Sequence, residues 1–258
     1  MRTIVIVGPV MHHGNGRDGA RLAWHEAGTG RPLVLLHGLL GDSALWTRSG
    51  HAQALAAQGY RVIMPDLRGH GGSARSHDAA AYPPDVLTDD GLALVEQLGL
   101  DDYDLGGYSL GARIAFRMAV RGAAPRRIVV GGQGLRELLG TGGGAGNLLR
   151  RVFAGGPFAP GSAEERTERW LRTNGEDPVA LGLVLDSIVD TPLADIERVT
   201  IPALVVMGAD DERAPSADEL AVALPGAVRA TVPGDHGAAA TAPELAAAII
   251  RFLGGAPL

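Results

Sequence analysis

The sequence of 258 residues contains no cysteine and no lysine, so all 23 basic residues are arginines. The absence of lysine excludes a Walker-type phosphate-binding loop and any chemistry that runs through a lysine Schiff base. The absence of cysteine excludes a thiol nucleophile, a thiolate zinc site and an iron–sulfur cluster. Any covalent catalysis would therefore rely mainly on Ser, Thr, Asp, Glu or His.

A net positive charge and long apolar runs are also lacking. The formal net charge is −6 at pH 7, which argues against a nucleic-acid partner, because such a partner requires a basic face. No apolar run reaches the roughly 18 residues of a membrane-spanning helix, and the run after Arg2 lacks a signal cleavage pattern. We expect a cytoplasmic monomer or homodimer that acts on a small molecule and binds no membrane.

Short runs rich in Val, Ile and Leu alternate with stretches of helical periodicity, which is typical of a mostly parallel sheet flanked by helices. We expect eight strands, at residues 4–7, 21–26, 33–36, 61–64, 103–107, 127–130, 203–207 and 229–232. The first two should form an antiparallel hairpin across a loop at 11–20, because no helix separates them. Helices are expected at 50–58, 85–98, 110–121, 216–224 and 243–253.

The interval at 133–200 is too long for a simple crossover between two strands. It carries helical patterns at 147–153, 163–173 and 178–189, and we interpret it as a helical cap inserted after the sixth strand. The core would then comprise residues 1–132 and 201–258. The glycine-rich run at 140–146 is either a hinge at the substrate entrance or a surface loop unrelated to entry, because ordering glycine loses much backbone entropy.

Ser109 lies in the pentapeptide Gly-Tyr-Ser-Leu-Gly at 107–111, which follows an expected strand and opens an expected helix. Glycines two residues before and after a serine permit a tight strand-to-helix turn that projects the hydroxyl above the sheet. Ser109 is therefore the candidate nucleophile. The alternative is a glycine-rich turn that contains a serine by chance.

A second turn, His37-Gly38-Leu39, follows the buried strand at 33–36. Gly38 allows close backbone approach, so the N–H of Leu39 can point into the same crevice as the N–H of Leu110. Two such donors would form an oxyanion hole worth on the order of 3 kcal/mol per donor. His37 itself is expected to hold the turn by a hydrogen bond.

Taken in chain order, His37-Gly38, the segment Pro-Asp-Leu-Arg-Gly-His-Gly-Gly-Ser at 65–73 and the Ser109 turn resemble the α/β-hydrolase superfamily. The resemblance extends over nearly the whole chain. It implies the α/β-hydrolase fold, an eight-stranded mostly parallel sheet with flanking helices, and it implies no cofactor and no metal. It also implies a catalytic acid after the seventh strand and a histidine after the eighth.

The acid that the resemblance selects is Asp211, three residues after Gly208 and four before Pro215. Asp210 and Glu212 remain alternatives, because a shift of one residue would reach either of them.

The histidine that matches the family's general base is His236, the only one of eight histidines that follows the acid. Its neighbour Asp235 departs from the family, where many relatives carry a small residue. Asp235 would either raise the pKa of His236 or face solvent.

The resemblance implies a serine hydrolase that cleaves an ester or lactone through an acyl-enzyme, with His236 as base and Asp211 as its partner. Small esterases, enol-lactonases and cofactor-free haloperoxidases (perhydrolases) resemble the chain about equally. Epoxide hydrolases and haloalkane dehalogenases carry an aspartate where Ser109 stands, which disfavours both. Carbon–carbon hydrolases are less favoured, because their usual oxyanion segment is absent at 39–41. A ligand-binding protein without hydrolytic activity is the alternative from another class.

Several large side chains are candidates for the wall of a substrate pocket, although the core of the cap would use the same residue types. They are Trp46, Tyr108, Phe153, Phe158 and Trp170, with leucines from 181–188. Because only 4% of the residues are aromatic, the pocket is expected to be aliphatic and to accept a small to medium apolar ester or lactone.

Overall fold

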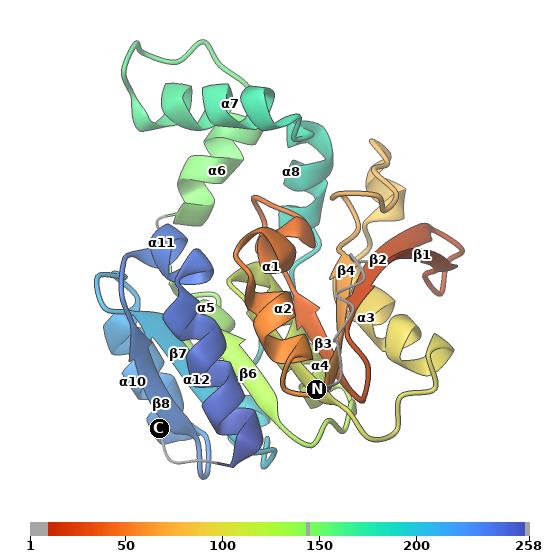
Figure 1. The fold of residues 1–258 in the computed structure, drawn as a ribbon. Helices are drawn as coiled ribbons and strands as arrows, with labels where there is room; N and C mark the ends of the chain where they lie inside the picture. Colours follow the sequence, from red (N-terminus) through yellow and green to blue (C-terminus); the bar gives the residue numbers. More distant parts are fainter. Residues whose placement is uncertain (1–9, 143–144, 256–258) are drawn as a thin grey trace.

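The computed structural model describes residues 10–142 and 145–255, and its strands form one sheet of eight (Figure 1). The strand order is β1-β2-β4-β3-β5-β6-β7-β8. Strands β3 to β8 run parallel to one another, whereas β2 pairs antiparallel with both β1 and β4. The strands are β1 Val10–Asn15, β2 Arg21–Ala27, β3 Arg31–Leu36, β4 Tyr60–Asp66, β5 Asp104–Tyr108, β6 Ile128–Gly131, β7 Ala203–Gly208 and β8 Val228–Val232. The predicted mostly parallel, eight-stranded sheet is confirmed.

The first strand is the element of the sheet that sequence reasoning misplaced. The strand expected at 4–7 lies outside the described residues, whereas β1 falls in the segment 11–20 that was expected to be a loop. The loop prediction is wrong because β1 is an edge strand whose residues are all exposed or half-exposed. Such a strand needs hydrogen bonds to one neighbour and no apolar run. β1 pairs antiparallel with β2, in the place predicted for the strand at 4–7.

The five helices predicted outside 133–200 lie within two residues of their predicted bounds. They are α2 His51–Ala56, α3 Val86–Gln97, α4 Leu110–Val120, α10 Ala214–Ala223 and α12 Pro243–Gly254. Five shorter elements, of three to six residues, were not predicted, because their apolar residues are too few to show a period. These are α1 Ala44–Arg48, α5 Leu135–Leu138, α9 Leu193–Ile196, α11 His236–Thr241 and the 3₁₀ turn η1 Ala79–Ala81. Within the described ranges no helix has both the length and the apolar character needed to cross a membrane.

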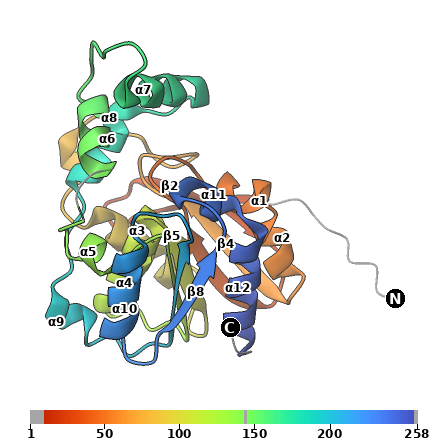
Figure 2. The same cartoon turned by 90° about the vertical axis from the view of Figure 1, so that its left-hand side faces the viewer.

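Helices cover both faces of the sheet, as Figure 2 shows for α3, α4 and α10 on one side and α2 and α12 on the other. The alternation of side chains along β3 explains this layering. Leu33 and Leu35 pack with α2 and α12, whereas Val34 and Leu36 pack with α3 and α4. Burying one such side chain completely stabilises the fold by about 2 kcal/mol. Because both faces are covered, successive residues of the central strands are apolar.

Three longer helices stand between β6 and β7, with the short α5 before them and α9 after them. They are α6 Ala145–Phe153, α7 Ala163–Asn174 and α8 Pro178–Asp186. Figure 1 shows them at one end of the molecule, standing off from the sheet. Buried side chains of all three belong to the same apolar cluster as Leu39 and Leu110. The helices thus extend the core above β3 and α4, and the division of the chain into a core and a cap at 133–200 stays a prediction.

Two residues of the glycine-rich run at 140–146, namely 143–144, lie outside the described residues. The part before them is a hydrogen-bonded turn, because the N–H groups of Thr141 and Gly142 both donate to the carbonyl oxygen of Arg136, at 2.8 and 3.0 Å. The helix α6 begins directly after the two residues. A hinge or gating role for this run stays a prediction.

Asp104, the first residue of β5, is a completely buried carboxylate. Neither carboxylate oxygen has a hydrogen-bond partner among residues 10–142 and 145–255. Burial raises the pKa of Asp104, and the charges of Arg31 and Arg127 offset only part of that effect. The folded chain therefore binds a proton on Asp104 at pH values where the unfolded chain has released it. Stability is lost as the pH rises from the unfolded pKa through the folded one.

We expect Asp104→Asn to raise the free energy of unfolding by about 1–3 kcal/mol at pH 8, because the amide removes a buried charge. The gain should shrink toward a pH of about 4, where unfolded aspartic acid is also protonated. Urea unfolding of both proteins at pH 8 and at about pH 4 measures this gain in the free energy of unfolding. The control is Asp102→Asn, an exposed carboxylate paired with Arg31, which should change the free energy by less than about 1 kcal/mol. A destabilised Asp104→Asn at pH 8 would show that the arginines stabilise the carboxylate.

Candidate active site

The turn between β5 and α4 holds Ser109 in a strained backbone conformation, with φ 55° and ψ −121°. Ser109 and Asp85 are the two non-glycine residues with positive φ among those described. Such a conformation costs on the order of 1–3 kcal/mol. The turn requires glycine on both sides, because a Cβ on Gly107 would lie 2.4 Å from the carbonyl carbon of Gly111. A Cβ on Gly111 would lie 2.2 Å from the carbonyl oxygen of Leu36.

His236 lies between Ser109 and Asp211. Its Nε2 is 2.9 Å from Oγ of Ser109, and its Nδ1 is 2.7 Å from Oδ2 of Asp211. Because a carboxylate can only accept, Nδ1 carries the proton in the neutral histidine, and Nε2 accepts from the serine hydroxyl. The parallel strands β5, β7 and β8 deliver these three residues from their carboxyl ends to one edge of the sheet. The structure thus brings all three candidate catalytic residues together.

The loop after β7 offers three adjacent acids, and only Asp211 turns inward. Its side chain is completely buried, whereas Asp210 and Glu212 are exposed. Oδ1 of Asp211 accepts from the backbone N–H and the guanidinium of Arg213, at 3.0 and 3.1 Å. Burial raises the pKa of Asp211, but the hydrogen bond from His236 and those from Arg213 outweigh burial and lower it below its usual value. Sequence reasoning missed Arg213, whose position two residues after the acid was the available signal.

The turn that carries Leu39 packs against the Ser109 turn. A Cβ built on Gly38 would lie 3.3 Å from Cβ of Ser109, so the two turns are in van der Waals contact. Neither the N–H of Leu39 nor that of Leu110 donates a hydrogen bond within the described part of the chain. Both groups remain available to an oxygen anion beside Ser109.

Two fully buried histidines hold this turn in place. Nε2 of His37 accepts from the N–H of Leu67 at 3.0 Å, so its Nδ1 donates to the carbonyl oxygen of Gly38 at 2.8 Å. His70 contacts the carbonyl oxygen of Leu39 through Nε2, at 2.7 Å. Burial lowers the pKa of both residues, that of His70 to about 4, so both rings are neutral at pH 7. The structural role expected for His37 agrees with these contacts.

Known proteins share this architecture. The family model for the alpha/beta hydrolase fold matches residues 31–128. An epoxide hydrolase from Caballeronia sordidicola is 34% identical over 115 residues, which are 45% of this chain and 34% of that protein. A non-heme haloperoxidase from Rhodococcus erythropolis is 28% identical over 242 residues, which are 80% of this chain and 84% of that protein. A bromoperoxidase structure from Bacillus anthracis has a TM-score of 0.70 at 25% identity and covers 96% of this chain and 100% of its own.

The chain belongs to the α/β-hydrolase superfamily. It spans only about a third of the length of several curated relatives that it matches, the epoxide hydrolase among them. The names of those relatives therefore describe their own activities and do not assign one to this chain. The superfamily assignment agrees with the order of turn, acid and histidine along this chain.

Tyr108, expected to line a pocket, instead lies in the core of this α/β-hydrolase. Its side chain is 2% exposed, and its ring centroid is 5.4 Å from that of His236. Burial raises the pKa of Tyr108, so the phenol stays protonated and donates to the carbonyl oxygen of His236 at 2.9 Å. A Cβ on Gly132 would lie 2.8 Å from the tyrosine ring and 3.0 Å from Cε1 of His236, so glycine is needed there. Tyr108 thus connects the Ser109 turn to the histidine loop.

Asp235 caps the helix that begins with His236. Its carboxylate accepts from the N–H groups of Gly237 and Ala238 at 3.0 and 2.9 Å. Of the two roles considered for Asp235, the structure places the residue on the exposed side, where it orders the start of α11.

The other expected pocket residues do not form one wall. Trp46 is 1% exposed and belongs to the core cluster beneath α2 and α12. Phe153 packs against the apolar cluster shared by α6, α7 and α8, and Phe158 is half-buried in the loop after α6. Sequence reasoning misjudged Trp46 because burial depends on which helix covers the residue.

Trp170 is the expected pocket residue that lines a hollow, which measures about 370 Å³. Leu40 forms the other side, and Ala163, Arg166 and Thr167 complete the stripe of α7 that faces it. Trp170 is 41% exposed and Leu40 is 36% exposed. Because Leu40 directly follows Leu39, the hollow opens beside the turn at 37–39.

We expect Asp211→Asn to slow the reaction of Ser109 with a fluorophosphonate by about 10⁴-fold, because an amide at this position favours the wrong histidine tautomer. Asp210→Asn is the matched control, and it should leave the rate nearly unchanged. Rates come from intact-mass spectra recorded over time. The opposite order of the two effects would mean that the acid is Asp210.

We expect Tyr108→Phe to slow the same reaction about fivefold, because one hydrogen bond that holds His236 is lost. The melting temperature should change little, since the ring still fills its space. Tyr82→Phe removes another buried hydroxyl, one with no hydrogen-bond partner in the described residues, and should not change the rate. Equal rates for wild type and Tyr108→Phe would show that the tyrosine only fills space.

Proposed function

We propose that the chain is a serine hydrolase that cleaves a small to medium apolar carboxylic ester or lactone through an acyl-enzyme. The observation that carries this proposal is the pair of contacts of His236, at 2.9 Å to Ser109 and at 2.7 Å to Asp211. A hydroxyl next to a neutral imidazole whose other nitrogen is held by a buried carboxylate is arranged for nucleophilic attack. Free N–H groups beside it suit acyl transfer in particular.

In the first half of the reaction, His236 takes the hydroxyl proton while Oγ of Ser109 bonds to the substrate carbonyl carbon. The N–H groups of Leu39 and Leu110 hold the negative oxygen that forms. Asp211 stabilises the resulting imidazolium. The imidazolium then gives its proton to the leaving alkoxide, and an acyl-serine remains.

In the second half, a water molecule gives a proton to His236 and attacks the acyl carbon. The bond to Oγ breaks, His236 returns the proton to Ser109, and the carboxylic acid leaves. The low pKa of Asp211 keeps it ionised throughout. Neither half requires a redox step.

The substrate class rests on the hollow between Leu40 and α7. Its volume of about 370 Å³ and its exposed Leu40 and Trp170 suit an apolar group of modest size next to the reacting carbon. Arg166 and Thr167 add a polar side to the same hollow.

A second candidate is the perhydrolase activity of cofactor-free haloperoxidases. It is favoured by the match to the Rhodococcus erythropolis haloperoxidase, which extends over 80% of this chain. In that reaction hydrogen peroxide replaces water in the second half and yields a peracid. Bromination of monochlorodimedone in acetate buffer with peroxide and bromide distinguishes it from simple hydrolysis.

We expect the wild type to hydrolyse p-nitrophenyl butyrate and to gain one fluorophosphonate adduct on Ser109, whereas Ser109→Ala should do neither. The substitution removes only the nucleophile, so circular dichroism and melting temperature should stay close to those of the wild type. The control is Ser76→Ala, which changes a serine in the loop after β4. A folded wild type without adduct or ester hydrolysis would favour the ligand-binding alternative. Retained hydrolysis in Ser109→Ala would disprove the mechanism.

A further inference from the structure

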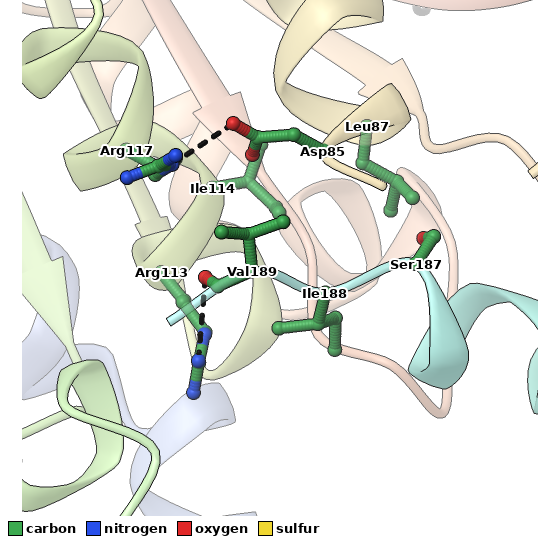
Figure 3. Close-up of a pocket in the computed structure, with 8 residues that line it drawn as sticks. All are labelled: Asp85, Leu87, Arg113, Ile114, Arg117, Ser187, Ile188 and Val189. Atoms are coloured by element: carbon green, nitrogen blue, oxygen red, sulfur yellow. Dashed lines mark hydrogen bonds and ion pairs between the residues drawn. The ribbon is translucent and has the colours of Figure 1, made fainter. Parts of the chain in front are cut away.

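Arg113 lies one helical turn after Ser109 on α4, and its backbone N–H donates to the carbonyl oxygen of Ser109 at 3.2 Å. Its side chain is 13% exposed and reaches Val189, in the segment between β6 and β7 (Figure 3). The mechanism does not use this arginine. Sequence reasoning did not single it out either.

The guanidinium binds both ends of the segment that carries α6, α7 and α8. On the first stem, residues 133–142, it donates to the carbonyl oxygen of Glu137. On the second stem, residues 187–191, it donates to the carboxylate of Asp190 and to the carbonyl oxygen of Val189, the latter at 3.4 Å. One side chain of the nucleophile helix therefore holds the chain where it leaves the core and where it returns.

The two stems are also joined to each other. The N–H of Thr191 donates to the carbonyl oxygen of Leu138 at 2.8 Å. A Cβ built on Gly140 would lie 2.2 Å from Cγ of Asp190, so a side chain there would displace this carboxylate. A movement of one stem therefore moves the other, and Arg113 is bound where they meet.

A second arginine of α4 supports the second stem. Arg117, one turn further on, donates to Asp85 at 2.9 Å, and the N–H of Asp85 donates to the carbonyl oxygen of Ser187 at 2.8 Å. Asp85 has φ 69° and shares the strained positive-φ state with Ser109 alone among the non-glycine residues described. Strain of this kind persists only where the surroundings hold it. Figure 3 shows Arg113, Arg117 and Asp85 around a small cavity of about 10 Å³ that Val189 also lines.

Arg113 has one ion-pair partner among the described residues. Burial lowers the pKa of Arg113, and the carboxylate of Asp190 is its ion-pair partner. Two backbone carbonyl oxygens also accept from the guanidinium, whereas Nε has no partner within the described residues. A buried guanidinium with one carboxylate and two carbonyl oxygens is held in one orientation, because each lost contact leaves a buried donor unpaired.

We propose that Arg113 is a positioning residue that sets the place of α6, α7 and α8 relative to Ser109, and through it the size of substrate that is accepted. The substrate part of this inference rests on the serine-hydrolase proposal above. The hollow lies between α7 and Leu40, so a shift of the stems changes its width without moving Ser109, His236 or Asp211. The changed width affects the binding of a substrate long enough to reach the hollow, whereas it does not affect the binding of a small substrate.

The experiment compares p-nitrophenyl acetate with p-nitrophenyl octanoate in wild type, Arg113→Met and Arg136→Met. Arg136 is the matched control, because it stands on the first stem but pairs with the exposed Glu219 of α10. In Arg113→Met we expect the KM for the octanoate to change about fivefold or more, while kcat/KM for the acetate stays within about twofold. Arg136→Met should match the wild type for both esters.

Two further variants keep the proposal testable if Arg113→Met does not fold. Arg113→Lys keeps the charge and should restore part of the octanoate preference, and Asp190→Asn should shift it in the same direction as Arg113→Met. Circular dichroism checks that each variant is folded. An equal fall for both esters in the folded variants, or no change in any of them, would overturn the positioning role.

A second readout needs no activity and separates the two proposals. Hydrogen–deuterium exchange of peptides from 145–186 should be faster in Arg113→Met than in wild type or Arg136→Met, with the peptides of β5 and β7 unchanged. If the wild type hydrolyses no ester but the exchange differs as expected, the serine-hydrolase proposal fails and the structural role of Arg113 stands. Unchanged exchange refutes the role of Arg113 whatever the activity.

Discussion

The close approach of α4 to the carboxyl ends of β3 and β5 is the contact on which the site depends. Gly107 and Gly111 leave no space for a side chain between strand and helix, and the chain makes this turn by placing Ser109 at φ 55°. The strain, on the order of 1–3 kcal/mol, persists because the residues that follow in α4 are buried between the sheet and α3. Gly38 also packs against this turn, where a Cβ on it would lie 3.3 Å from Cβ of Ser109.

Two buried aspartates of the same sheet show how partners decide the state of a carboxylate. Asp211, at the carboxyl end of β7, has donors on both oxygens, from His236 and Arg213, and its pKa is lowered despite burial. Asp104, at the opposite end of β5, has no donor on either oxygen within the described ranges, and burial raises its pKa. Burial alone therefore does not set the charge. The hydrogen bonds available at each end of the sheet do.

The helix α4 connects the Ser109 turn to the segment that carries α6, α7 and α8. It begins with Leu110 directly after Ser109, carries Arg113 at the stems one turn later, and carries Arg117 at Asp85 one turn after that. Because a helix repeats about every 3.6 residues, these positions follow one another along its length at a fixed distance. A rigid helix thus keeps the Ser109 turn and the stems at a fixed distance from each other, although the two belong to distant parts of the chain.

The sequence by itself determined where the second to eighth strands and the main core helices lie along the chain, the Ser109 turn at 107–111 and the position of His236 after the last strand. These features follow from apolar periodicity, local glycine requirements and chain order. The tertiary structure alone decided which acid of 210–212 turns inward, that β1 is an edge strand, and that Tyr108 supports a histidine instead of lining a pocket. It alone showed the stems bound to Arg113, whose partners lie 24 to 77 residues away. Such contacts depend on how the layers pack, which no local pattern encodes.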